Sequence, residues 1–573
     1  MGNFRDLNQQ QMFNFIKIRN SNLSFTLFLT GFFIFQLTIA QTTDQETRPE
    51  LVQLFNDWRN FESPPLIDGV FDYSQETFDR RWETFMSLKT KLEGLEKDNW
   101  SVQEQVDWHL LWAEMNGYIF NTTILKPWQR DPAFYKSIWT YKSDVPAHEG
   151  PTPHFVIELW QYHFPLNKES RKKLISSLKR IPKLNQQAQQ NLTGNAKDLW
   201  ITGIRDIQNQ AKVLEGILSK PDVIEDYALV SQINKALVST NSFVNWLQKE
   251  VPKKNGPSGI GKENYTWYQQ NVHLVPLSWD DELILLKREL ARAWSSLKLE
   301  EHRNRNLPEL TAADSADAYD LLAQNAAKEL VEFLDKNDIV TVKDYFSEAL
   351  KPHLGKYIPA EKRNFFWITA HLDPKPLFSH FYHWFELERM KLEPNPNPLR
   401  KNALLYNIFD SRSEGLATAV EEMFMNAGLY DKNPRAREIV YILIAQRAAR
   451  GLGSLYAHAN IISMENAGKI HSEYTPRGWM KTEKELLVFE QHLYLRQPGY
   501  GTSYITGKYL IEEMMMDVAK QKKKKFNLKM FFDALSAIGN IPVSLGRWEM
   551  TQDSSQIQNI KNSFRPLKEV LAN

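Results

Sequence analysis

Two histidines and a glutamate lie close together in the segment Ser379-His380-Phe381-Tyr382-His383-Trp384-Phe385-Glu386. If this segment is helical, His380, His383 and Glu386 are each three residues apart, so neighbouring members face nearly the same direction. Two imidazoles and a carboxylate can hold zinc, and a further carboxylate such as Glu414 from another helix would add to the set. The segment therefore predicts a metal site, with Zn²⁺ as the cofactor if one is bound.

The spacing differs from that of the metallopeptidase helix His-Glu-x-x-His. In that helix the histidines are four residues apart, and a glutamate beside the first acts on the metal-bound water. Phe381 follows His380 here, so that base is missing. A second interpretation therefore stays open, in which the two histidines are partly buried, are bonded to backbone groups and hold no metal.

A glycine-rich segment, Gly256-Pro-Ser-Gly-Ile-Gly261-Lys262-Glu263, nearly fits a phosphate-binding loop. Glu263 stands where that motif needs a hydroxyl, and the residues before the segment do not form a buried strand. A turn before a helix is the better interpretation, and we expect no nucleotide cofactor.

Apolar residues recur at helical spacing along most of the chain. One stripe contains Phe78, Trp82, Phe85, Leu92 and Leu95, and another contains Leu283, Leu286, Leu290, Trp294 and Leu297. Ser101 with Glu104, and Ser278 with Asp281, have the spacing of helix starts. Strand-like alternation is scarce. The patterns predict an all-α fold, mostly helical with at most a few short strands.

The loops are marked by proline and glycine, and none is long or biased enough to be a flexible linker between domains. We therefore expect residues 41–573 to form a single helical domain, with two lobes that could meet near residues 251–277.

The N-terminus has the order of a secretion signal. Lys17 and Arg19 precede an apolar run from Leu23 to Ile39, and a small residue, Ala40, ends it. Residues 1–40 are therefore predicted to be a signal peptide cleaved after Ala40, and the protein is expected to be exported to the periplasm or the cell exterior. A retained membrane anchor is the weaker alternative, because polar residues interrupt the run. We expect no stable membrane insertion after cleavage.

The composition excludes several classes of function. The 573 residues include 70 basic and 69 acidic ones, a formal charge of +1, so no global field draws the chain to nucleic acid. There is no cysteine, which excludes disulfides, thiolate zinc sites and cysteine nucleophiles. A metal ligand here would be His, Asp or Glu.

Several blocks in the C-terminal half agree in order and spacing with one known family. The blocks are Glu414-Gly415-Leu-Ala-Thr-Ala-Val-Glu421, Gly428-Leu-Tyr430-Asp431, Arg447-Ala448-Ala449-Arg450 with His458, Ser463-Met-Glu465-Asn-Ala467, Pro498-Gly499-Tyr-Gly-Thr-Ser503-Tyr504 with Gly507, and Phe532-Asp533-Ala-Leu535. In these blocks the chain resembles the bacterial domain-of-unknown-function family 885. The resemblance is strongest from about residue 400 to 550 and looser back to residue 50. It implies an exported, helical, zinc-peptidase-like protein with a central cleft.

The chain departs from the family at its signature, a His-Glu-x-x-Pro-Gly-His segment. Leu377-Phe378-Ser379-His380-Phe381-Tyr382-His383 occupies that window. If His383 takes the place of the final histidine, Leu377 and Phe378 replace the first ligand and the general base. His380 could substitute for the lost ligand, one helical turn from His383, with Glu414 as the third ligand.

Two functions of different class follow. In the first, the chain is a divergent metal-dependent peptidase or amidase. Glu386 or Glu388 would be the base, and Tyr504 and His458 would donate hydrogen bonds to the developing oxyanion. In the second, the metal site is lost or altered and a helical cleft binds a peptide or glycan. The loss of two polar groups favours the second function.

Overall fold

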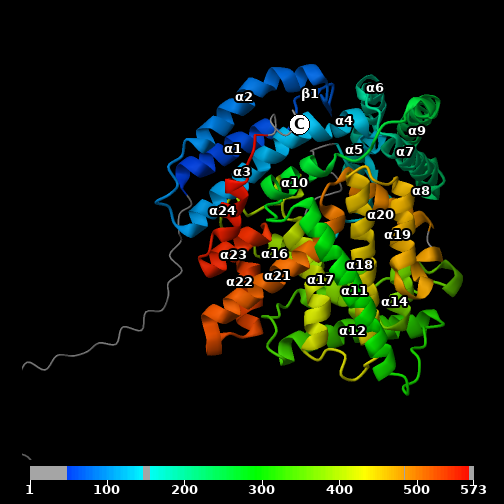
Figure 1. Ribbon diagram of the computed structural model, residues 1–573. Coiled ribbons are helices and arrows are strands. Elements are labelled where there is room, and N and C mark those ends of the chain that lie inside the picture. Colours follow the sequence, from blue (N-terminus) through cyan, green and yellow to red (C-terminus); the bar gives the residue numbers. More distant parts are fainter. Residues whose placement is uncertain (1–47, 146–154, 483, 567–573) are drawn as a thin grey trace, which may run out of the picture. The chain divides into compact units, whose positions relative to one another are not determined.

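A computed structural model describes residues 48–145, 155–482 and 484–566 (Figure 1). The predicted signal peptide, residues 1–40, lies outside the described residues. The described residues all belong to one compact unit.

Helices make up most of the described chain, as the all-α prediction requires. The first group is α1 Pro49–Glu62, α2 Gln75–Glu93, α3 Val102–Phe120, α4 Pro127–Arg130, α5 Lys168–Leu178, α6 Ile181–Asn191, α7 Lys197–Leu218, α8 Pro221–Ile224 and α9 Tyr227–Glu250. The second group is α10 Lys262–Asn271, α11 Trp279–Arg303, α12 Ala316–Lys336, α13 Phe346–Leu350, α14 Phe365–Leu372, α15 Lys375–His380 and α16 Tyr382–Leu392. The third is α17 Asp410–Asn426, α18 Ala436–His458, α19 Met464–Tyr474, α20 Lys484–Arg496, α21 Tyr500–Lys522, α22 Leu528–Ile538, α23 Val543–Thr551 and α24 Ser555–Asn562.

The strands of the described residues are short. Strand β1 Leu66–Ile67 pairs with β2 Val70–Phe71 in an antiparallel hairpin. Strand β3 Ile138–Trp139 pairs in parallel with β4 Ile157–Glu158. The expectation of at most a few short strands is confirmed.

The predicted helix starts are confirmed at α3 and α11. The Ser101 hydroxyl accepts the backbone N–H of Glu104, and the Glu104 carboxylate accepts the backbone N–H of Ser101. Ser278 and Asp281 exchange the same pair of bonds at the start of α11. Both exchanges satisfy backbone donors that the first turn of a helix leaves free.

Helices α17, α21, α18 and α11 pack side by side in the middle of the C-terminal half (Figure 1). Two glycines set the spacing of α17 and α21. A Cβ on Gly507 would lie 2.1 Å from the carbonyl oxygen of Ser411, and one on Gly415 would lie 2.4 Å from the backbone of Gly507. The two backbones therefore touch at a distance that no larger residue allows.

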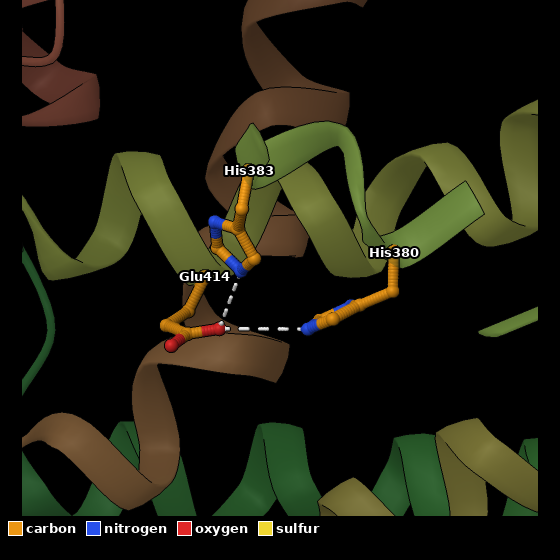
Figure 2. A group of neighbouring side chains, drawn as sticks. All are labelled: His380, His383 and Glu414. Atoms are coloured by element: carbon orange, nitrogen blue, oxygen red, sulfur yellow. Dashed lines mark hydrogen bonds and ion pairs between the residues drawn. The ribbon is translucent and has the colours of Figure 1, made fainter. Parts of the chain in front are cut away.

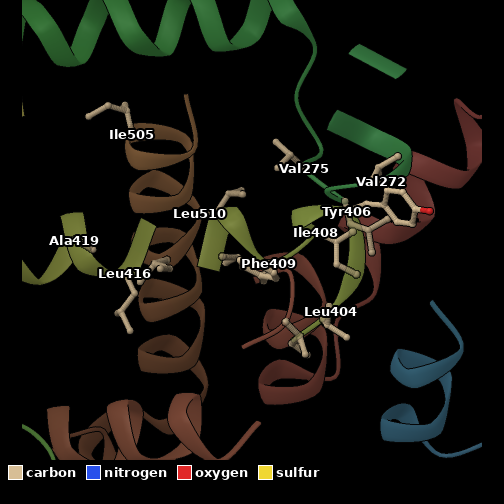
Figure 3. Packing of buried hydrophobic residues seen from close by; sticks show 14 of the residues in the cluster. Val272, Val275, Leu404, Tyr406, Ile408, Phe409, Leu416, Ala419, Ile505 and Leu510 are labelled. Atoms are coloured by element: carbon tan, nitrogen blue, oxygen red, sulfur yellow. The ribbon is translucent and has the colours of Figure 1, made fainter. Parts of the chain in front are cut away.

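A continuous hydrophobic cluster surrounds this contact. Figure 3 shows Leu416 and Ala419 of α17 with Ile505 and Leu510 of α21, and all four belong to the same buried cluster. The cluster extends through residues 404–409 toward Val272 and Val275 after α10. Close packing of this kind holds α17 and α21 in fixed positions.

No helix within residues 48–145, 155–482 and 484–566 combines the length and apolar character needed to cross a bilayer.

Candidate metal centre

His380, His383 and Glu414 come together from three helices. His380 is the last residue of α15, His383 is the second residue of α16, and Glu414 lies in the first turns of α17. The expectation that one helix carries both histidines is wrong, because Phe381 has a ψ of 10° and separates α15 from α16. The imidazole rings nevertheless lie 5.0 Å apart between their centroids.

One nitrogen from each histidine and one carboxylate oxygen face a common point (Figure 2). The Nε2 of His383 lies 3.1 Å from Oε2 of Glu414, and the Nε2 of His380 lies 3.7 Å from the same oxygen. The ligand atoms of the three residues all lie within 4.8 Å of one another. Ligands of tetrahedral zinc, at bond lengths near 2.1 Å, are about 3.4 Å apart. The two shorter separations therefore fit a zinc site closely.

A second set of side chains orients the histidines. The Nδ1 of His380 lies 3.0 Å from Oε1 of Glu421, whose carboxylate also accepts two hydrogen bonds from Arg447. The Nδ1 of His383 lies 3.2 Å from the Ser413 hydroxyl. Nη2 of Arg447, which can only donate, also lies 3.1 Å from the Nδ1 of His380. In the tautomer that donates Nδ1–H to Glu421 or Ser413, the lone pair of Nε2 is directed at a metal.

Glu414 is oriented in the same way. The Tyr500 hydroxyl donates to Oε1 of Glu414 at 2.5 Å, while Oε2 faces the two imidazoles. One oxygen is therefore bound by Tyr500, and the other faces the imidazole nitrogens, as the oxygen of a ligating carboxylate does.

The site is buried and its charges depend on one another. The exposed fractions of His380, His383 and Glu414 are 7%, 4% and 1%. Burial alone would raise the pKa of Glu414, but the charge of His383 and hydrogen bonds from both histidines lower it well below its ordinary value. Burial alone would lower the pKa of His383, but Glu414 raises it. Glu414 is thus held as an anion by the positive charge of His383 and by the hydrogen bonds from both histidines.

A cavity of about 430 Å³ adjoins His380, whereas His383 and Glu414 lie behind its wall. His380 and Tyr500 form part of its wall, together with Arg447, Arg450 and Tyr504. Most of the remaining wall is aromatic or aliphatic. Apolar walls with a few convergent polar groups are typical of sites that bind small ligands.

The structure places the other predicted site residues differently. Tyr504 lies in the cavity wall, with its ring stacked on His380 at 6.1 Å. Glu386 does not join the metal group, because its carboxylate accepts bonds from Arg412 and Ser536, both at 3.0 Å. The alternative base, Glu388, pairs with Lys391 at 2.7 Å.

His458 also lies outside the cavity wall. Its Nε2 lies 2.8 Å from the carbonyl oxygen of Tyr494, and burial lowers its pKa to about 4. It is a neutral, buried imidazole that contacts the ring of Tyr265 at 5.5 Å.

The positions of the lost signature groups are apolar and buried. Leu377 lies in the cavity wall, and Phe378 is fully buried and stacks on Phe381 at 5.4 Å. Neither position can supply a ligand or a base.

Sequence reasoning missed several residues of the site. Glu421 lies on the same helix as Glu414, seven residues after it, so the helical repeat could have indicated it. Ser413 directly precedes Glu414, and the repeat does not place it on the same face. Asp144 lines the cavity but is more than 200 residues before the histidines in the sequence. It lies outside any helix or strand, so no local pattern points to it.

Solved structures share this fold, although no family model and no curated protein matches the chain. A protein from Shewanella oneidensis, described as a "putative lipoprotein of unknown function", aligns with a TM-score of 0.59 and 16% identity, over 87% of this chain and 97% of that one. A "putative lipoprotein" from Colwellia psychrerythraea aligns with a TM-score of 0.60 and 16% identity, over 86% and 92% of the two chains. At this identity the likeness extends to the fold alone.

Proposed function

We propose that this chain is an exported, metal-dependent hydrolase of amide bonds, with Zn²⁺ held by His380, His383 and Glu414. The observation that carries the proposal is the convergence of these three ligands beside a cavity. The resemblance to family 885 supports a peptide or related amide as the substrate.

The number of ligands favours catalysis over a structural role. Structural zinc sites are closed by four protein ligands, whereas catalytic sites have three and an open position. Within the described residues, the group consists of two histidines and one glutamate, with no fourth His, Asp or Glu. His380 lies in the cavity wall, so the proposal places the open position on the cavity side of the group.

Zinc, when bound, supplies a Lewis acid that polarises a carbonyl group and lowers the pKa of water to about 7. The chain itself must accept and return a proton. Asp144 is the carboxylate best suited to this, because it lines the cavity and accepts no hydrogen bond from a described residue. Burial raises the pKa of the Tyr500 hydroxyl, and the charges of Glu414, Tyr504 and Asp144 raise it further. Asp144 therefore lies close enough to influence the side chain that binds Glu414.

The reaction balances with these groups. The oxygen of a water forms a bond to the carbonyl carbon, the carbon–nitrogen bond breaks, and one proton moves from water through Asp144 to the leaving nitrogen. Tyr504 faces the cavity with a pKa that burial raises well above its ordinary value, so its hydroxyl stays protonated and can donate a hydrogen bond to the developing oxyanion.

Export is part of the proposal and is supported from two sides. Residues 17–40 have the order of a secretion signal. The two solved structures that share the fold are both described as lipoproteins, a class of exported proteins.

Zinc content tests the metal site directly. The purified protein is stripped with a chelator, dialysed against zinc and analysed for metal, beside His383→Ala and a control, His302→Ala, at an exposed histidine of α11. We expect about one zinc per chain in the native protein and the control, and almost none in His383→Ala. Equal, negligible zinc in all three would refute the hydrolase.

Activity tests the proton acceptor separately. Asp144→Asn should retain zinc and lose about 10²-fold or more of its amide hydrolysis, measured as amine release from a mixed peptide pool. Full activity in this variant would show that another group accepts the proton.

A second function, ligand binding without catalysis, is favoured by one observation. Leu377 and Phe378 are apolar at the two positions where the signature of family 885 has its first metal ligand and its general base. A protein of this kind would bind a peptide or glycan in the cavity and release no amine from any peptide, whether or not zinc is present.

A further inference from the structure

One guanidinium in the cavity wall is only partly paired. Arg450 lies on α18, is 3% exposed, and donates from Nη1 to Oε1 of Glu490 at 2.8 Å. Its Nε is buried without a hydrogen-bond partner, and no described residue accepts a bond from its Nη2. Other arginines of the described residues, such as Arg412 and Arg435, also have an unpartnered buried Nε, but Arg450 lies in the cavity wall, where a ligand could supply an acceptor.

The neighbouring Arg447 also has a buried Nε without a partner, but both of its terminal nitrogens are paired. Its two terminal nitrogens donate to the two oxygens of Glu421, at 3.0 Å and 2.6 Å. Glu421 in turn lies against His380, so Arg447 belongs to the support of the metal ligands. Among the described residues, Arg450 therefore differs from Arg447 in its terminal nitrogens, because only Nη1 of Arg450 is bonded to a carboxylate.

Aromatic contacts place Arg450 close to the metal ligands. Its Cζ lies 3.8 Å from the ring centroid of Tyr504, and that ring stacks on His380 at 6.1 Å with an interplanar angle of 15°. The three groups form a column along the wall, with the imidazole at one end and the guanidinium at the other. Since each residue of an extended peptide adds about 3.5 Å, the column is no longer than two or three residues.

The rest of the wall is suited to an apolar side chain. It contains Phe366, Trp367, Leu377, Phe381, Phe489 and Leu493. The cavity volume of about 430 Å³ accommodates a compound the size of a short peptide, not a folded protein. A ligand that fills it would place an apolar group against these residues and an acceptor against Arg450.

We propose that Arg450 binds a free carboxylate of the substrate, so the compound hydrolysed is an N-acyl amino acid or short peptide whose C-terminal residue is apolar. This inference rests on the hydrolase proposed above, because the carboxylate on Arg450 determines which amide bond lies at His380, His383 and Glu414. Water adds its oxygen to the acyl carbon, the carbon–nitrogen bond breaks and the nitrogen gains a proton. The products are a carboxylic acid and an apolar amino acid whose carboxylate stays on Arg450.

Binding to the metal-free protein tests the inference without any catalysis. The ligands are N-acetyl-L-phenylalanine and its C-terminal amide, which differ only in the charged group, and affinity is measured by titration calorimetry with EDTA present. We expect the acid to bind about ten-fold more tightly or better than the amide, since hydrogen bonds to charged groups contribute that much. In Arg450→Met the two ligands should bind within about two-fold of each other.

Two further variants keep the result interpretable. Arg288→Met removes an exposed arginine of α11, outside the cavity wall, and should leave the preference for the acid unchanged. If Arg450→Met fails to fold because Glu490 loses its partner, Arg450→Met/Glu490→Gln removes both charges and should give the same loss of preference.

The inference is overturned if the native protein binds acid and amide equally, or if a folded variant without Arg450 still prefers the acid. Because zinc is absent from this assay, either result is independent of the zinc measurement that tests the hydrolase. If the protein binds zinc but shows no preference for the acid, the proposed hydrolase is retained and the role of Arg450 in binding a carboxylate is refuted.

Discussion

Glu282 should make the stability of this protein depend on pH near neutrality. It lies on α11, is fully buried, and accepts hydrogen bonds from Tyr265 at 2.7 Å, Thr506 at 2.9 Å and Thr502 at 3.3 Å. Burial raises its pKa from 4.5 to about 7, although the hydrogen bonds lower it in part. Since Thr502 and Thr506 lie on α21, the charge of Glu282 acts on the helix that supplies Tyr500 and Tyr504.

The size of the effect follows from the two pKa values. Below pH 4.5 Glu282 is neutral in both the folded and the unfolded chain, so its contribution to stability is complete. Between pH 4.5 and about 7 only the unfolded chain ionises, and each pH unit lowers the free energy of unfolding by about 1.4 kcal/mol. The total loss by pH 7 to 8 is about 3 kcal/mol.

Glu282→Gln isolates this contribution because the amide does not titrate. We expect the variant, compared with the native protein, to gain about 3 kcal/mol of stability between pH 4.5 and pH 7.5, measured by urea denaturation. The difference between the two proteins cancels every other titrating group. Glu83→Gln, at an exposed position of α2, is the control and should show no comparable trend.

A difference between native protein and Glu282→Gln that stays constant within about 0.5 kcal/mol over this pH range would refute the reasoning. It would mean that Glu282 is already ionised in the folded protein near pH 5, and hence that water or a cation reaches it.

Two further predictions concern the helices around the metal ligands. Gly507→Ala should lower the free energy of unfolding by about 1–3 kcal/mol and weaken zinc binding, because its Cβ would push α21 away from Ser411 on α17. The control Gly216→Ala, with nothing within 4 Å of its Cβ, should be stabilised by about 0.5–1 kcal/mol, and equal effects in the two variants would contradict the close contact. Glu421→Gln should weaken zinc binding about 10- to 100-fold in competition with a chelating dye, because the amide orients the Nδ1–H of His380 less strongly. Unchanged zinc affinity in this variant would exclude Glu421 as the partner that matters.

The helices were predictable because their signals are local. The apolar stripes and the pairs Ser101–Glu104 and Ser278–Asp281 act within one or two turns, and α2, α3 and α11 follow them closely. The ligand set His380, His383 and Glu414 was also predicted, and the structure brings the three residues together.

The roles that depend on packing between distant segments could not be predicted. Glu386 has the right spacing from His383, but Arg412 of α17 and Ser536 of α22 bind its carboxylate. In the sequence, Arg450 is only one member of the block Arg447-Ala448-Ala449-Arg450. Its unpaired donors are known only from the folded structure, because its one carboxylate partner, Glu490, lies on another helix.

Helix α17 carries the groups that the proposed metal site would use in place of the His-Glu-x-x-Pro-Gly-His pattern. Ser413, Glu414 and Glu421 all lie on this helix, and they supply one ligand and the partners of both histidines. The histidine segment then has to supply only two imidazoles, and the break at Phe381 lets both Nε2 atoms approach the same carboxylate oxygen. The position of that oxygen depends on the contact of α17 with α21, because Tyr500 of α21 holds the other oxygen of Glu414. A change in the spacing of these two helices should therefore weaken metal binding even when all three ligands are present.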